Sequence, residues 1–426
     1  MKQPVISRRN AVIGLGALTL SACGKSPVRA AARTAAASTA PAPVVKVAAN
    51  SGFDAWVAGF RQQAAAAGYS QSLLNTAFRG VGYLPDVIAK DSKQSEFTRT
   101  LEDYLAIAAS DERVKNGRAK YRQYGSTLKA IENKYGVEAK VVAAIWGLES
   151  SYGARRGNTP IVSAMATLAY DGRRRDFFTK QLYAVLKILG AGDTTPENMR
   201  GSWAGAMGHT QFMPTSFLES AVDFTGDGRR DIWGDDPTDA LASAANYLRR
   251  AGWKKGQPWG VEVQVPQGFD FGKSGFSTKR SVGDWMAMGV RNMDGGKVPA
   301  YGSARVIHPA GGGGPGFMVF HNFDVIKRYN NSTSYAIGVG HLGDRIAGGG
   351  PVRGNFGPDP QGLTLEDRKD IQRRLTQKGF DTDGADGVIG AKSETAIRAY
   401  EQAKGLKVTG VATKALLIHL GGRPRG

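Results

Sequence analysis

The sequence predicts a mainly α-helical protein with small β elements, followed by a separate small domain of three helices. Apolar residues recur at helical spacing in runs such as 97–109, 137–148 and 240–250. One short alternating run, 261–265, is typical of a β-strand. A Gly/Pro-rich stretch at 348–360 predicts a linker between a long region, 51–347, and a compact C-terminal segment, 361–421.

Residues 1–23 have the organisation of a lipoprotein signal peptide. A basic flank precedes the apolar segment 11–20, which is too short to span a bilayer. The segment ends at Cys23, the only cysteine of the chain, and the stretch 20–23 resembles a bacterial lipobox, whose cysteine is lipidated. An ordinary signal peptide cut near a chance cysteine is the alternative. Gly24 stands where inner-membrane lipoproteins usually have Asp, which favours a periplasmic protein anchored to the outer membrane.

The composition of the next segment and the overall charge limit the classes of partner. Residues 24–50 are rich in Ala, Pro, Ser and Thr, cannot form a core, and predict a flexible tether. The chain carries 56 Lys and Arg against 37 Asp and Glu, a formal charge of +19, which favours anionic partners. No nucleic-acid-binding module is recognisable, so we expect no nucleic-acid partner. Peptidoglycan, whose stem peptides carry carboxylates, fits the charge equally well.

The helix expected at 137–148 leads into a candidate catalytic residue, Glu149. Positions 141, 145, 149 and 152 fall on one helical row, on which Glu149 is the only charged residue. A carboxylate in such surroundings tends to have a raised pKa and can then act as a general acid. A Glu exposed at a fraying helix end fits the spacing equally well.

Several ordered motifs resemble the membrane-bound lytic transglycosylase B family, which has a lysozyme-like fold. They lie at 147–153, 201–216, 245–247 and 328–330, with Tyr335 beyond, and the resemblance covers roughly 53–347. It implies that Glu149 is the catalytic acid/base. It also implies that a substrate cleft is lined by Gln211, Ser202, Tyr247, Tyr329, Tyr335 and Tyr104. Core positions for Tyr247 and Tyr104, and a helix cap for Ser202, remain alternatives.

The resemblance also implies the reaction. Ordinary glycosidases need two carboxylates, but no second carboxylate motif accompanies Glu149. In the family, one residue protonates the glycosidic oxygen between N-acetylmuramic acid (MurNAc) and N-acetylglucosamine (GlcNAc), then deprotonates the muramoyl C6 hydroxyl, which closes a 1,6-anhydro ring. We therefore expect a lytic transglycosylase that remodels the cell wall. A hydrolytic muramidase on the same scaffold and a non-catalytic wall-binding lipoprotein are the alternatives.

The segment 223–231 looks like the start of an EF-hand calcium loop. The resemblance implies ligands from Asp223, Thr225, Asp227, the Arg229 carbonyl and Asp239. About two extra residues before Asp239 and two arginines inside the loop speak against tight binding, and a metal-free Asp/Gly turn is the alternative. We expect no required cofactor, with structural calcium as the one candidate.

The C-terminal segment 361–421 resembles a peptidoglycan-binding type 1 domain. The motifs at 371–375, 386–390 and 405–410 carry the resemblance, although Ser393 replaces the usual Thr. Such a domain raises the local concentration of substrate by tethering. The expected partners are peptidoglycan glycan strands and, through the lipid on Cys23, a membrane. Cell-wall synthesis proteins are further candidates.

Overall fold

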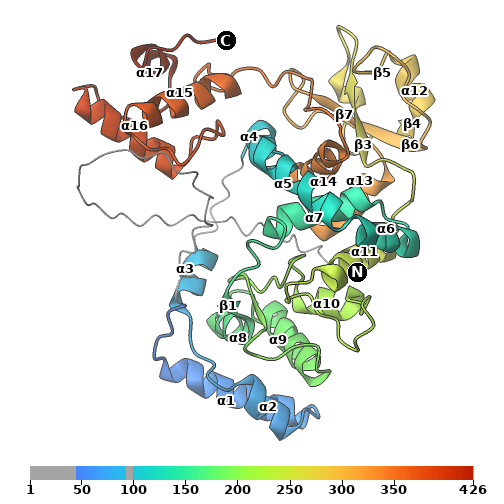
Figure 1. The fold of residues 1–426 in the computed structure, drawn as a ribbon, viewed down its shortest axis with the longest axis vertical. Helices are drawn as coiled ribbons and strands as arrows, with labels where there is room; N and C mark the ends of the chain where they lie inside the picture. Colours follow the sequence, from blue (N-terminus) through green and yellow to red (C-terminus); the bar gives the residue numbers. More distant parts are fainter. Residues whose placement is uncertain (1–44, 93–98, 426) are drawn as a thin grey trace, which may run out of the picture. The chain divides into compact units, whose positions relative to one another are not determined.

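The computed structural model describes residues 45–92 and 99–425 (Figure 1). The signal peptide, Cys23 and most of the tether lie outside the described residues. Seventeen α-helices and small sheets make up the described chain, so the predicted mainly α class is confirmed. Among these residues, no helix combines the length and the apolar character that crossing a bilayer requires.

The described chain forms two compact units that do not follow its linear order. The first unit contains 99–156 and 208–425, and the second contains 45–92 and 157–207. The region predicted as one catalytic domain, 51–347, therefore contributes to both units.

The second unit is a small helical body whose core lies between two antiparallel helices, α8 and α9. Its elements are α1 (Ser51–Ala66), α2 (Gln71–Ala77), α3 (Pro85–Ser92), β1 (Thr159–Pro160), α8 (Ile161–Asp171), α9 (Arg175–Gly190) and β2 (Arg200–Gly201). Asn50 and Ser70 cap α1 and α2 by accepting hydrogen bonds from backbone N–H groups. At the end of α3, the buried Asp91 accepts hydrogen bonds from Arg173 and Arg174 at 2.8 Å each, so its charge is neutralised.

The first unit is built around helix α7 (Ala139–Ser150). Every residue of α7 from 141 to 147 is buried, because other helices pack on all its sides. The helices that pack on α7 or on its neighbours are α4 (Leu101–Ala108), α5 (Asp111–Gln123), α6 (Gly125–Tyr135), α10 (Pro214–Ser220), α11 (Thr238–Arg250), α13 (His321–Tyr329) and α14 (Thr333–Ile346). Figure 1 shows α14 and α5 beside α7, in agreement with their contacts.

A five-stranded antiparallel sheet follows α11 in the chain, with the order β4-β6-β7-β3-β5. Its elements are β3 (Gly260–Gln264), β4 (Arg280–Ser281), β5 (Arg291–Asn292), β6 (Ser303–Ile307) and β7 (Gly316–Val319), with a short helix, α12 (Val282–Ala287), packed against it. Trp285 of α12, Val306 and Met318 form its core. The predicted strand at 261–265 is confirmed as β3, whereas two other strands of the sheet, β4 and β5, have only two residues and leave no alternating pattern.

Three short helices form the C-terminal domain, as predicted. They are α15 (Leu365–Gln377), α16 (Ala391–Ala403) and α17 (Lys414–His419). Thr364 and Asp367 form a reciprocal capping box at the start of α15. Ile371, Ile397 and Leu417, all fully buried, contribute one core residue from each helix.

Candidate active site

Glu149 lies in the last turn of α7 and is half-buried. The helix ends in two consecutive non-glycine residues with left-handed backbone, Ser151 at φ 51° and Tyr152 at φ 58°. Such conformations cost about 1–3 kcal/mol each and persist only where the surroundings hold them. Gly153 follows at φ 88°, and a Cβ there would collide with the imidazole of His209. The chain therefore turns sharply directly after Glu149.

Hydrogen bonds join this helix end to residues 208–211. The Ser150 hydroxyl donates to the His209 carbonyl at 2.6 Å and accepts from the Gly153 N–H. Trp146 Nε1–H donates to His209 Nδ1 at 3.1 Å. Because Nδ1 accepts, the ring proton of the neutral imidazole lies on Nε2 and points to the Gly234 carbonyl at 2.7 Å. Burial lowers the pKa of His209, which favours this neutral form.

The hydroxyl of Tyr335, on α14, contacts the Glu149 carboxylate directly. It donates to Glu149 Oε1 at 2.6 Å, and the Tyr335 side chain is buried. Burial, and after it the negative charge of Glu149, raises the pKa of Tyr335 well above its ordinary value. Tyr335 therefore keeps its proton at physiological pH and stays a hydrogen-bond donor to the carboxylate.

Tyr104 of α4 lies against the same helix, α14. A Cβ at Gly338 would come within 2.7 Å of the Tyr104 ring, so the absence of a side chain at Gly338 lets the ring pack closely. Burial and the charge of Glu149 also raise the pKa of Tyr104. The structure thus brings Tyr104 and Tyr335 together around Glu149.

Gln211 follows the His209 segment and has a left-handed backbone, with φ 51°. Its Nε2 donates to the carbonyls of Arg156 and Gly208 at 3.0 and 2.8 Å. Two carbonyl acceptors fix the orientation of the amide, because only the nitrogen can face them. The Gln211 side chain is therefore held by backbone on both sides, with Oε1 as its acceptor.

Tyr329 and Tyr247 pack beside this segment. The Tyr329 ring is 1% exposed, and its hydroxyl donates to the Thr210 carbonyl at 2.6 Å. Tyr247 of α11 is half-buried, lies 4.9 Å from the Tyr329 ring centroid, and donates to the Arg328 carbonyl. These contacts make Tyr329 a support beneath residues 210–211, whereas Tyr247 keeps an accessible surface.

Ser202 belongs to the second unit. Its Oγ accepts from the Ala206 N–H at 3.0 Å, and its own N–H donates to the Ala206 carbonyl. These reciprocal bonds close the turn at 202–206, so Ser202 lies in a loop rather than at a helix N-terminus.

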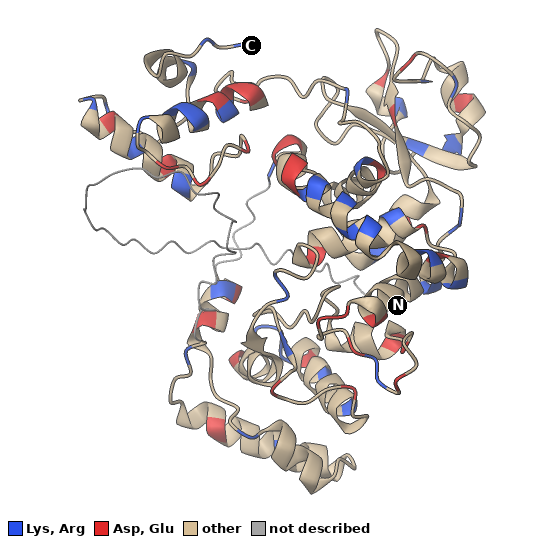
Figure 2. Ribbon diagram, viewed as in Figure 1, with Lys and Arg blue, Asp and Glu red and all other residues tan. Residues whose placement is uncertain are grey.

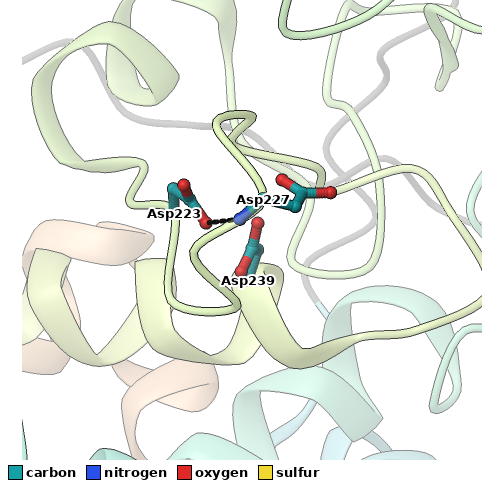
Figure 3. Close-up of side chains that lie close together, drawn as sticks. All are labelled: Asp223, Asp227 and Asp239. Atoms are coloured by element: carbon teal, nitrogen blue, oxygen red, sulfur yellow. Dashed lines mark hydrogen bonds between the residues drawn. The ribbon is translucent and has the colours of Figure 1, made fainter.

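Three carboxylates converge where the loop before α11 meets the first turn of that helix (Figure 3). Asp223, Asp227 and Asp239 each offer an oxygen within 4.8 Å of the others. Asp239 is buried, and burial raises its pKa, with a further rise from the charge of Asp223. Backbone N–H groups, that of Gly228 first, lower the pKa of Asp223. Among the predicted ligands, Thr225 donates its hydroxyl to Asp223 rather than joining the acceptors.

Comparison with known proteins decides the family. The sequence pattern that defines the transglycosylase SLT domain matches residues 52–344. The chain belongs to this transglycosylase family. A peptidoglycan-binding domain matches residues 364–420, so this transglycosylase-family enzyme carries a wall-binding domain at its C-terminus, and both predicted resemblances are confirmed.

Individual relatives agree with the family. Membrane-bound lytic murein transglycosylase B of Escherichia coli (strain K12) is 37% identical over 238 residues. That match covers 55% of this chain and 64% of the relative, so the chain spans less than two thirds of the relative's length.

Solved structures extend the likeness. SltB3 from Pseudomonas aeruginosa, in complex with NAG-NAM-pentapeptide, is 46% identical to this chain, with a TM-score of 0.71. The match covers 87% of this chain and 100% of the SltB3 chain. Its complex with NAG-anhNAM-pentapeptide gives 45% and 0.70, with the same coverage. Escherichia coli Slt35 in complex with calcium is 31% identical, covers 68% of this chain and 92% of its own, and has a TM-score of 0.59.

The residues that hold the C-terminal end of α7 in place were not identified from the sequence. Trp146, Ser150 and His209 lie within or beside the quoted motifs, but none was assigned a role. The sequence did contain one indication of such a role, because Ser150 and His209 are polar residues within segments of mostly apolar or small residues. Their bonds span 63 and 59 residues, a separation that no local pattern reports.

The His209 contacts predict a pH-dependent loss of stability. The folded-state pKa of His209 lies below its ordinary value, so the stability contributed by the neutral ring is fully present above about pH 6.5 and is lost as the pH falls below it. We expect the free energy of unfolding, measured in urea at pH 7.5, 6.5 and 5.5, to fall less steeply in His209→Gln than in the unaltered protein.

His321→Gln is the matched control, because that half-buried ring bonds only to the carbonyl of Gly252 among the described contacts. An equal decline in His209→Gln and the unaltered protein would remove His209 as the titrating group.

Proposed function

We propose that this chain is a lytic transglycosylase that cleaves the MurNAc-GlcNAc β-1,4 bond of peptidoglycan and leaves 1,6-anhydromuramoyl ends. The observation that carries the proposal is a single carboxylate, Glu149, hydrogen-bonded by a buried tyrosine. Burial first, and then the charge of Glu149, raises the pKa of both Tyr104 and Tyr335, and no other carboxylate among the described residues contributes comparably. The relatives support the proposal, since SltB3 was solved with NAG-NAM-pentapeptide and with NAG-anhNAM-pentapeptide.

Glu149 acts first as an acid and then as a base. Its Oε1 accepts the Tyr335 hydrogen bond, and the protonated carboxyl supplies the transferable proton. That proton passes to the glycosidic oxygen as the bond to the anomeric carbon breaks. The carboxylate left behind takes the proton of the C6 hydroxyl, whose oxygen bonds to the anomeric carbon. Glu149 ends the cycle protonated, and no water is consumed.

Tyr335 and Gln211 assist in different ways. The neutral Tyr335 hydroxyl donates to the carboxylate that forms after the first proton transfer, when the negative charge most needs a partner. Gln211 is held by two backbone carbonyls through its nitrogen, which leaves Oε1 to accept from the N–H of a substrate acetamido group. Tyr104 and Tyr247 offer aromatic surface for sugar rings.

We expect Glu149→Gln to abolish release of soluble muropeptides from purified sacculi while binding to sacculi persists. Glutamine keeps the shape of the side chain but neither donates nor accepts a transferable proton. Mass spectrometry of the products from the unaltered protein should show 1,6-anhydro ends. Reducing ends would support the hydrolytic alternative, and release by Glu149→Gln would overturn the assignment of Glu149.

Tyr335→Phe should retain part of the activity. It removes one charge-assisted hydrogen bond, worth about 1.5–3 kcal/mol, so we expect kcat to fall roughly tenfold to a hundredfold. The matched control is Tyr400→Phe, which removes a buried hydroxyl that bonds to His419 in the C-terminal domain. Equal kcat values for Tyr335→Phe and the unaltered protein would show that the hydroxyl does not act on the reacting carboxylate.

We also propose that the loop before α11 binds calcium as a structural ion. Three carboxylates with oxygens within 4.8 Å fit a hard divalent cation, and Asp223, Asp227 and Asp239 would hold it. The ion would fix the loop and would take no part in the reaction. Arg229 Nη2 lies 3.4 Å from Asp227 Oδ2 and partly offsets the negative charge, which weakens the affinity.

Calcium should therefore raise the thermal stability of the protein. At a calcium concentration a hundred times Kd, binding adds about 2.7 kcal/mol to the free energy of unfolding. We expect Tm to rise with calcium, to return after chelation, and not to respond in Asp239→Asn. Glu219→Gln, an exposed neutralisation on the preceding helix, is the control. A Tm that calcium leaves unchanged in the unaltered protein would favour the metal-free turn.

The cell envelope is the proposed location. The relative from Escherichia coli is named as membrane-bound, which supports an envelope location in a Gram-negative bacterium. We further propose that Cys23 carries the lipid and anchors the enzyme at the periplasmic face of the outer membrane, since it is the only cysteine and follows an apolar signal segment.

A further inference from the structure

An arginine of the C-terminal domain, Arg368, is almost completely buried although it lies near the start of α15. Its side chain is 7% exposed. Within its own domain, Nε donates to the Gly387 carbonyl at 2.8 Å and Nη1 to the Leu363 carbonyl at 3.3 Å. These bonds account for one side of the guanidinium and fix its plane.

The other side of the guanidinium faces three carboxylates outside α15. Nη2 donates to Glu102 Oε2 at 2.6 Å and to Asp103 Oδ1 at 3.0 Å, both in the acidic first turn of α4 (Figure 2). Nη1 donates to Asp359 Oδ2 at 3.1 Å, in the linker. We call these four residues the Arg368 clasp. It joins the wall-binding domain to a helix of the catalytic region across more than 260 residues of sequence.

The clasp depends on its arginine. The side chains of Glu102, Asp103 and Asp359 are 15%, 25% and 19% exposed, so water screens them poorly. Burial raises the pKa of Glu102, Arg368 lowers it, and Asp103 and Asp359 raise it further. Three carboxylates and one guanidinium leave an excess of negative charge. Without contact to Arg368, the carboxylates of α4 and of the linker would repel each other.

The linker is also held at its other end. Glu262 of β3 accepts from the N–H groups of Arg353 and Gly354 at 3.0 and 2.6 Å, and Arg353 Nη1 pairs with Asp294. Contacts at both ends of 353–359 distinguish it from the flexible spacer that its composition predicts. The linker is thus held by residues of the sheet region, and the wall-binding domain itself by α4.

Helix α4 connects the clasp with the candidate active site. Tyr104 follows Asp103 directly in the chain and packs on Gly338 of α14. Burial and the nearby charge of Glu149 raise its pKa. A domain fixed to the first turn of α4 therefore has a fixed orientation relative to the reacting carboxylate. Simple tethering would raise local substrate concentration but would set no orientation.

We propose that Arg368 is a positioning residue that docks the wall-binding domain on α4, so that a glycan strand bound by that domain is presented to Glu149 in one orientation. The inference rests on the proposed function and assigns to the domain a role beyond affinity. Its distinguishing prediction is that undocking slows cleavage of polymeric wall without slowing cleavage of a short fragment.

The test uses the full-length protein with Glu102→Gln and Asp103→Asn combined. This change replaces the two ion pairs to α4 by contacts with uncharged amides. It leaves the bonds of Arg368 to Gly387, Leu363 and Asp359. The matched control combines Glu112→Gln and Glu219→Gln, two exposed neutralisations on α5 and α10 that give the same change in charge. Substrates are purified sacculi and the shortest uncrosslinked glycan-peptide fragment that the unaltered protein cleaves.

Relative to the control, we expect the clasp variant to cleave sacculi about tenfold more slowly, with fragment turnover and sacculus binding changed by less than about twofold.

A second pair of variants tests the ion pair itself. Arg368→Glu should lose sacculus activity, and adding Glu102→Arg should restore most of it.

Three outcomes would overturn the inference. Sacculus cleavage by the clasp variant within about twofold of the control would show that the domain acts by tethering alone. A parallel loss on sacculi and fragment would show that Glu102 and Asp103 act on the fold of the catalytic region. Failure of the unaltered protein to cleave either substrate would overturn the proposed function itself, and the inference with it.

Discussion

The catalytic region depends on the bonding between the end of α7 and residues 208–211. Glu149 sits where a buried helix stops, and a helix end is the part of a helix most prone to fray. Ser150 and Trp146 prevent fraying by bonding to the backbone and to the ring of His209. The same segment positions Gln211, and Tyr329 supports it from below. One set of buried hydrogen bonds thus aligns the acid and the amide, which come from different segments.

The features that the sequence predicts well are those with a local signature. The helix before Glu149, the strand at 261–265 and the three C-terminal helices each leave a periodic pattern, and the structure contains all of them. Glu149 itself stayed ambiguous on spacing, and the ordered motifs gave it a role. The contact with Tyr335 agrees with that role.

The features that the sequence does not predict depend on partners far along the chain. Two-residue strands such as β4 and β5 exist because β6 and β3 pair with them, so they have no pattern of their own. The division into two units follows packing rather than chain order. Arg368 reads as an ordinary exposed helix residue, because helical spacing says nothing about carboxylates 265 and 266 positions earlier. The composition of 348–360 likewise predicts a flexible linker. In the structure, Glu262 binds its backbone at 353–354, and Asp359 binds Arg368.

The distance along the chain between Glu149 and Tyr335 has a further consequence, which concerns how the protein is made. Their hydrogen bond closes a loop of 186 residues, and such long-range contacts form late because the chain entropy must be overcome first. A nascent chain has its carboxylate long before it has the helix that completes the site. The enzyme therefore gains its full catalytic arrangement only after α14 has been synthesised. A chain interrupted before α14 would carry the acid without its donor, and an unfinished molecule would be a poor catalyst wherever it was released.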